Sequence, residues 1–153
     1  MEITKIPDKI LAKKTEEVLI EDIKNGSYKE LVLTMKKAMK DNIGVGLAAN
    51  QIGKGLSVFV IDTKTADAYK VPEVYFNPEI TEYSADTDEM EEGCLSIPEN
   101  YFPIKRSRKV KLKAIDEEGN KFKIKARGFL ARVLQHETDH LNGKTIKDRA
   151  NEK

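Results

Sequence analysis

The stretch GFLARVLQHETDHLNG, residues 128–143, decides the fold, because it places both histidines of the chain inside an apolar, helix-forming segment. Ala131, Val133, Leu134 and Leu141 make this segment too apolar for a helix that lies free on the surface. Gly143 is a natural C-terminal stop for such a helix. We therefore expect a buried helix whose polar side chains point at something inside the protein.

The two histidines have the spacing of metal ligands. His136 and His140 are four residues apart, so on a helix both imidazoles leave the same face, about 5–6 Å apart at Cβ. Two ring nitrogens at that separation can bind one ion. Glu137 completes the pattern H-E-x-x-H, in which the glutamate acts as general base. The alternative is a solvated helix face with two histidines at helical spacing by chance, but the chain has no other histidine, which favours the metal site.

A third ligand is available upstream, at the lone cysteine Cys94. It lies in EEGCLSIP, where a glycine and a proline indicate a loop or a strand end. A single cysteine is more often a small buried hydrophobe. Beside two histidines, however, its thiolate completes a three-ligand set with a fourth position open for water, as in catalytic sites. Zinc peptidases usually take their third ligand downstream, where only Asp148 and Glu152 are available, so a peptidase is the second hypothesis.

The rest of the chain carries patterns of both strands and helices. Residues 1–26 predict a strand-like lead and a short helical turn. Ser27 and Glu30 form a capping-box sequence that predicts an amphipathic helix over residues 28–41. Residues 58–61 and 74–76 predict strands, and residues 110–114 and 122–126 alternate apolar residues with lysines, as in a β-hairpin. Several strands with a helix before and after them indicate one α+β domain.

Composition bears on location and partners. The chain has 27 Lys and Arg against 26 Asp and Glu, a net charge of +1, so no overall field attracts nucleic acid. One cysteine cannot form an internal disulfide, and no segment has the apolar length of a signal peptide or a membrane span. We expect a cytoplasmic protein that binds no membrane and recognises no nucleic-acid sequence. A basic cluster is a candidate contact for ribosomal RNA, although the solvated face of a strand explains it better: Lys105, Arg106, Arg108, Lys109, Lys111 and Lys113.

Three motifs resemble the signature motifs of the bacterial peptide deformylases: GVGLAANQ (Gly44–Gln51), EGCLS (Glu92–Ser96) and QHETDHLNG (Gln135–Gly143). Their order and spacing fit that family, and Ile6-Pro7-Asp8 is also typical of it. The resemblance implies a single catalytic domain over residues 1–153, with antiparallel β-sheets packed around a C-terminal metal-binding helix and a further amphipathic helix near the N-terminus. It also implies a hydrolase that removes the formyl group from the N-terminal formylmethionine of newly synthesised proteins.

The resemblance assigns the catalytic and metal-binding roles. One divalent ion, expected to be Fe2+ and replaceable by Zn2+, Ni2+ or Co2+, is held by Cys94, His136 and His140. Glu137 is the general base and acid for attack by a metal-bound hydroxide. The side-chain amide of Gln51 and the backbone N–H of Leu95 stabilise the oxyanion.

The resemblance also assigns the substrate side of the site. The substrate-binding residues are Gly44, Val45, Gly46, Glu92, Gly93, Phe129 and Val133. An apolar pocket for the methionine side chain is expected near Val45, Phe129 and Val133. We also expect Glu92 to pair with Arg106 behind the site.

Two departures from the family bear on its partners. The sequence ends ten residues after Gly143, so we expect no long C-terminal helix of the kind that some members use at the ribosome, and only a transient ribosome contact. Some members have an arginine shortly after the EGCLS loop that helps to bind the peptide, whereas this chain has Tyr101 near that position. A monomer is expected. A non-catalytic binding module would have lost a ligand or the base, and none is missing.

Overall fold

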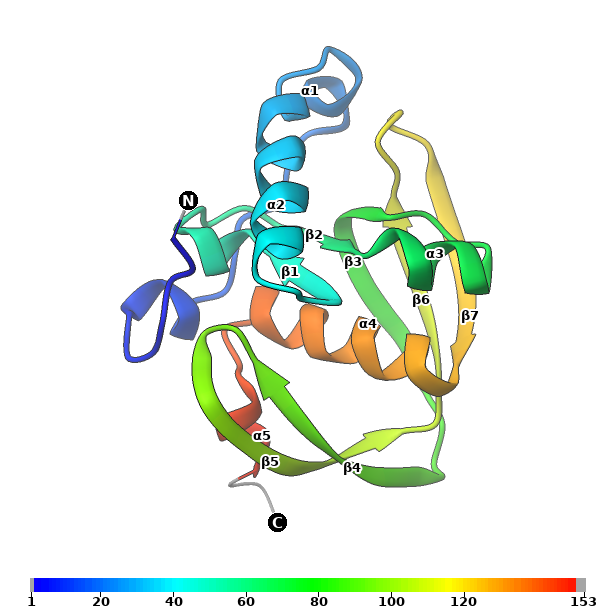
Figure 1. The fold of residues 1–153 in the computed structure, drawn as a ribbon. Helices are drawn as coiled ribbons and strands as arrows, with labels where there is room; N and C mark the ends of the chain where they lie inside the picture. The colour runs from blue at the N-terminus through cyan, green and yellow to red at the C-terminus, as the bar shows by residue number, and fades with distance from the viewer. Residues whose placement is uncertain (1, 151–153) are drawn as a thin grey trace.

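The computed structural model describes residues 2–150, which form two antiparallel sheets around one long helix (Figure 1). The first sheet contains, in spatial order, β1 (Gly46–Ala48), β2 (Val58–Ile61), β3 (Val74–Tyr83), β6 (Lys109–Ile115) and β7 (Lys121–Arg127). The second sheet contains β4 (Thr87–Cys94) and β5 (Ile97–Ser107). The helices are α1 (Ile20–Lys24), α2 (Lys29–Asp41), α3 (Thr63–Tyr69), α4 (Gly128–Leu141) and α5 (Ile146–Ala150), with 3-10 turns η1 (Lys9–Ala12) and η2 (Ala49–Ile52). The predicted fold class is confirmed.

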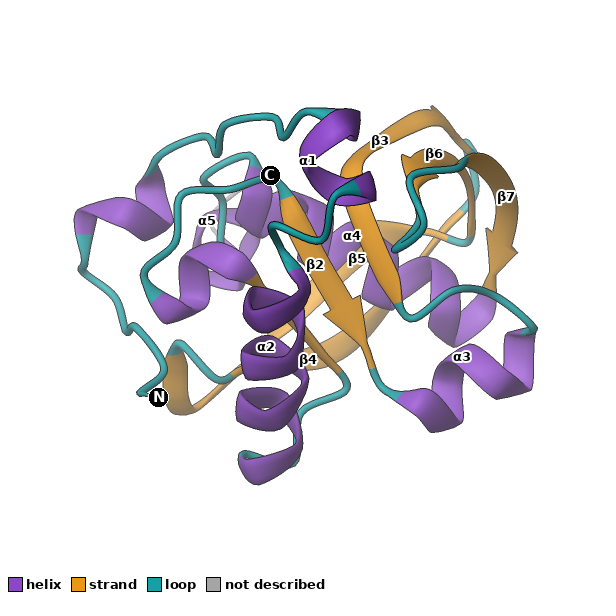
Figure 2. Ribbon diagram, turned by 90° about the horizontal axis from the view of Figure 1, so that it is seen from above, coloured by secondary structure: helices purple, strands orange, loops and turns teal. Residues whose placement is uncertain are grey.

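Strand β2 is covered on both faces of the five-stranded sheet. Its side chains alternate, so Val58 and Val60 pack into one apolar cluster with α2, while Phe59 and Ile61 pack into a second cluster with α4. Figure 2 shows α2 and α4 on opposite sides of β2. A strand that is buried on both faces gains from an apolar residue at every position, which explains the continuous apolar run in the sequence.

Helix α2 is confirmed, but its predicted capping box is wrong. The helix begins at Lys29 after Tyr28, and no side chain within residues 2–150 caps its start. The Ser27 hydroxyl instead donates to the Asn25 side chain at 2.5 Å. Gly26, at φ 84°, turns the chain so that Ser27 faces Asn25 rather than the first turn of the helix.

The predicted hairpin is present as β6 and β7, with Leu112 opposite Ile124. Its lysines lie on the exposed face, and Lys111 and Lys113 form ion pairs with acidic residues of β3. The solvated-face interpretation is therefore confirmed for these lysines but wrong for Arg106, which is only 5% exposed. Buried carboxylates, described below, explain why this one cation leaves the surface.

Several further elements differ from the prediction, and strands β1, β4 and β5 were not predicted. Residues 2–26 contain η1 and α1 but no strand, only an isolated bridge between Glu16 and Leu56. Strand β3 continues through Pro78 because the proline lies at a shift in register, where its missing N–H breaks no regular pairing. Helix α3 was not predicted. The segment after Gly143, for which no element was predicted, forms α5, whose Ile146 packs against β5. No helix within residues 2–150 has the length and apolar character needed to cross a bilayer.

Candidate metal centre

Helix α4 and the end of β4 bring the three predicted ligands together. The Sγ of Cys94 lies 3.3 Å from the Nε2 of His140, and that nitrogen lies 3.3 Å from the Nε2 of His136. All three donor atoms lie within 4.8 Å of one another, the only such group of His, Cys, Asp and Glu among the described residues. Strand β4 ends at Cys94, and the bulge after Gly93 turns the sulfur toward the helix. The long-range prediction that these residues meet is confirmed.

The donor set fits a divalent cation. Two imidazole nitrogens and a sulfur that lie this close together can share protons in hydrogen bonds or direct their lone pairs at one ion. Burial alone would lower the pKa of His136, but the adjoining Cys94 and Glu92 raise it to about 10, so a metal ion would have to displace a proton from this ring. Burial lowers the pKa of His140, which favours the neutral imidazole that metals require. Mixed thiolate and imidazole ligands suit iron, zinc and nickel alike.

Glu92 fixes the orientation of His136. The carboxylate is 7% exposed and accepts a hydrogen bond from the Nδ1 of His136 at 2.9 Å, which leaves Nε2 directed at the other ligands. Arg106 donates to the same carboxylate at 2.7 and 2.9 Å, and Arg132 also binds it. Burial alone would raise the pKa of Glu92, but the contacts with His136 and Arg106 hold it well below its usual range. The predicted pair of Glu92 with Arg106 is confirmed.

The ion pairs continue from Arg106 to the end of the described chain. Arg106 donates from Nη1 to Asp139 at 2.7 Å. Arg149 of α5 donates to both oxygens of Asp139, at 2.7 and 2.9 Å. His136 is thus joined to α5 by a chain of mostly buried charged side chains: Glu92, Arg106, Asp139 and Arg149.

Glu137 lies beside the ligands with an unusual environment for a carboxylate. It is 3% exposed, and its Oε1 has no hydrogen-bond partner among the described residues. A Cβ at position 46 would lie only 2.6 Å from its Oε2, so Gly46 provides the space that the carboxylate occupies. Burial raises the pKa of Glu137 to about 7. A carboxylate with that pKa can both accept and return a proton near neutral pH.

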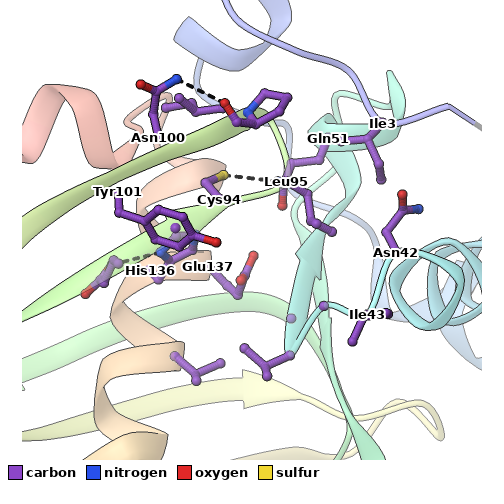
Figure 3. A pocket seen from close by; sticks show the side chains of 18 of the residues that line it. Ile3, Asn42, Ile43, Gln51, Cys94, Leu95, Asn100, Tyr101, His136 and Glu137 are labelled. Carbon is purple, nitrogen blue, oxygen red and sulfur yellow. Dashed lines mark hydrogen bonds and ion pairs between the residues drawn. The ribbon is translucent and has the colours of Figure 1, made fainter.

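Gln51 is held with its amide nitrogen toward the ligands. Its Oε1 accepts from the N–H of Ala48 at 3.0 Å, and its Nε2 donates to Ser96 at 3.1 Å and to the sulfur of Cys94 at 3.6 Å. The side chain is 2% exposed, which is inconsistent with a surface amide. Figure 3 shows Gln51, Leu95, Cys94, His136 and Glu137 gathered around one pocket.

This pocket has a volume of about 860 Å³. It is lined by Glu137, Gln51, Leu95 and every residue predicted to bind substrate: Gly44, Val45, Gly46, Glu92, Gly93, Phe129 and Val133. Cys94 and His136 also line it, whereas His140 is fully buried behind them. The structure therefore brings the predicted residues to one site, while their separate roles stay predictions.

Several residues that build the site were missed in the sequence. Arg132 precedes His136 by one helical turn, and this spacing was the available signal for its contact with Glu92. Ser96 and Asn50 lie within the quoted motifs; Ser96 binds Gln51, and Asn50 donates to the carbonyl of His140 at 2.6 Å. Of the downstream acids, Asp148 accepts from the N–H of Thr145 at 2.8 Å, and Glu152 lies outside the described residues.

Comparison with known proteins gives a consistent result. A family model described as polypeptide deformylase matches residues 1–153. Peptide deformylase 1 of Clostridium perfringens is 46% identical over 136 residues, which cover 89% of this chain and 88% of that protein. The crystal structure of peptide deformylase from Thermotoga maritima superposes with a TM-score of 0.88 at 36% identity, covering 99% of this chain and 97% of that one. A Met-Ala-Ser-bound peptide deformylase from Acinetobacter baumannii has a TM-score of 0.87 at 31% identity, with 97% of each chain covered.

Proposed function

Because the chain belongs to the polypeptide deformylase family, we propose that the pocket around Cys94, His136 and His140 is its catalytic site. The chain is a metal-dependent hydrolase that removes the formyl group from the N-terminal formylmethionine of newly synthesised proteins. One observation carries the assignment of the site. Two of the three converging metal donors, Cys94 and His136, line the same pocket as Glu137, a buried carboxylate whose Oε1 has no hydrogen-bond partner within residues 2–150.

Cys94, His136 and His140 hold the divalent ion in this proposal. When bound, such an ion acts as a Lewis acid that polarises a carbonyl and lowers the pKa of water. Glu92 keeps the His136 ring turned so that Nε2 stays available, since its carboxylate accepts the Nδ1 hydrogen. Ferrous iron is the proposed native ion, with zinc, nickel or cobalt able to replace it.

Glu137 moves the proton. Its carboxylate, with a pKa of about 7, takes the proton of the attacking water and passes it to the nitrogen of the leaving amine. Oε1 is buried and has no competing hydrogen bond from the described residues, so it is available for that exchange. Gly46 supports this role by leaving the space in which the carboxylate lies.

Gln51 and Leu95 stabilise the negative charge that develops on the formyl oxygen. The Gln51 amide is already fixed by Ala48 and Ser96, so it needs little reorganisation to serve as a donor. Leu95 follows Cys94 and contributes its backbone N–H. Val45, Phe129 and Val133 line the pocket and form an apolar site for the methionine side chain.

The test compares two substrates on anaerobically purified protein of known metal content. The enzyme should release formate from formyl-Met-Ala-Ser and leave the internal peptide bonds of Met-Ala-Ser intact. The Met-Ala-Ser-bound relative supports the choice of this peptide. Cleavage of internal peptide bonds without formate release would instead support the peptidase hypothesis. Elemental analysis of the same sample tests iron as the native ion.

The cellular setting is part of the proposal. We propose that residues 1–153 act as one catalytic domain, as a monomer in the cytoplasm, on nascent chains during transient contact with the ribosome. Sedimentation of the purified protein tests the monomer, and co-sedimentation with ribosomes tests the contact.

A further inference from the structure

Helix α2 ends in a turn that normally requires glycine. The N–H of Gly44 donates to the carbonyl of Met39 at 2.9 Å, and the N–H of Ile43 donates to that of Lys40 at 3.1 Å. This pair of bonds is the Schellman motif, in which the residue at the position of Ile43 adopts the left-handed conformation. Ile43 does so, with φ at 55°. A β-branched residue is strongly disfavoured there, because its side chain crowds the backbone.

Burial does not compensate for this strain. Ile43 is 93% exposed, the highest value among the exposed large hydrophobic residues of the described chain. Glycine or asparagine would end the helix at lower cost and would present no apolar surface to water. The helix end therefore explains the conformation at this position, but not the isoleucine.

The position of Ile43 suggests what the side chain does. It lines the catalytic pocket, on the loop that leaves α2, whereas Tyr101 lines it from β5 (Figure 3). Five of the nine exposed large hydrophobic residues within residues 2–150 line this one pocket: Ile43, Val45, Met90, Tyr101 and Phe129. Such a concentration of exposed apolar side chains marks a binding surface.

We propose that Ile43 is a specificity-determining residue that contacts an apolar side chain in the two residues after the methionine of the substrate. This inference rests on the proposed function, since it assumes that a formylmethionyl peptide occupies the pocket. The exposed carboxylates of Glu2, Glu91 and Glu99 line the pocket against one exposed lysine, Lys5, so an acidic side chain at these substrate positions is disfavoured. The enzyme thus favours chains in which an apolar residue closely follows the methionine.

The test measures kcat/KM for formyl-Met-X-Ser and formyl-Met-Ala-X, with leucine or serine as X. At one of the two positions, the wild type should have a higher kcat/KM with leucine than with serine. Ile43→Asn should reduce the ratio of these two values by about four-fold, which corresponds to the burial of one methylene group. Ile43→Leu should keep it. Ile43→Asn should also raise the midpoint of thermal unfolding, because asparagine tolerates the left-handed conformation. Leu33→Gln, which removes an exposed leucine of α2 outside the pocket, should leave the preference unchanged.

A second readout does not depend on turnover. The dissociation constant of the product peptide Met-Leu-Ser, or of Met-Ala-Leu, should increase in Ile43→Asn relative to that of Met-Ala-Ser. An unchanged preference and unchanged peptide binding in Ile43→Asn would overturn the inference. Failure of the wild type to release formate from any of these formylmethionyl peptides would contradict the proposed function instead.

Discussion

Replacing Gly46 by alanine should reduce turnover by displacing Glu137. The added Cβ would lie 2.6 Å from Oε2 of Glu137 and 3.0 Å from both its Cδ and Cγ, whereas an ordinary contact begins at 3.4 Å. The carboxylate must therefore retreat by about 0.8 Å, and a misplacement of about 1 Å at a reacting group costs on the order of 10²-fold in rate. Because Gly46 does not have a positive φ, alanine introduces no backbone strain at this position.

The assay is kcat and KM for formyl-Met-Ala-Ser, with metal content measured on the same sample. We expect Gly46→Ala to lower kcat by about 10²-fold, with the metal retained. Overpacking should also reduce the free energy of unfolding by about 1–3 kcal/mol. Gly55→Ala is the matched control, because its Cβ would meet no atom within 4 Å. A normal kcat with a raised KM would refute the reasoning, since it would mean that Gly46 serves peptide binding rather than the placement of Glu137.

Three further predictions concern the same site. Glu137→Gln should keep its metal but lose about 10²- to 10⁴-fold in kcat, measured with the same peptide, and full activity would refute the proton-transfer role. Glu92→Gln should weaken metal binding by about 10- to 100-fold in a chelator competition. The pKa of Glu92 is lowered in the folded protein, so the ionised carboxylate stabilises the fold above the ordinary pKa of a glutamate. This stabilisation is lost as the pH falls through the pKa that Glu92 has in the folded protein. The Glu92→Gln variant should therefore lose less stability on acidification than the wild type. Removing the ion with a chelator should lower the free energy of unfolding. The expected loss is about 2.7 kcal/mol relative to protein in a free ion concentration of 100 times the dissociation constant, and restoring the ion should reverse it.

The ligands were predictable from the sequence because their signal is local or scarce. The four-residue spacing of His136 and His140 places them on one face of a helix, and Cys94 is the only cysteine. The distance between Cys94 and the helix could not be derived from spacing, since 46 residues separate it from His140. The scarcity of cysteine and histidine suggested that connection, and the resemblance to the family motifs then implied the same ligand set.

Most contacts of the charged residues that support the site could not be predicted from the sequence. Arg106 was assigned both to a buried pair and to a solvated face, because its neighbours in the sequence are exposed lysines. Only the folded chain places it between Glu92 and Asp139. Likewise, the Ser27 capping box failed because a competing side-chain acceptor, Asn25, lies two residues away. In both cases, one tertiary or turn contact outweighed a valid local pattern.

The ion pairs that connect α5 with His136 have a consequence for how the protein ages. If heat or a protease detaches α5, Asp139 loses Arg149 and keeps only Arg106 among its charged partners described here. Arg106 is then drawn toward Asp139, its hold on Glu92 weakens, and the ring of His136 is less firmly oriented. We therefore expect damage at the surface to cause dissociation of the ion first, while the sheets and α4 are still folded. A stored sample would lose activity before it loses its fold.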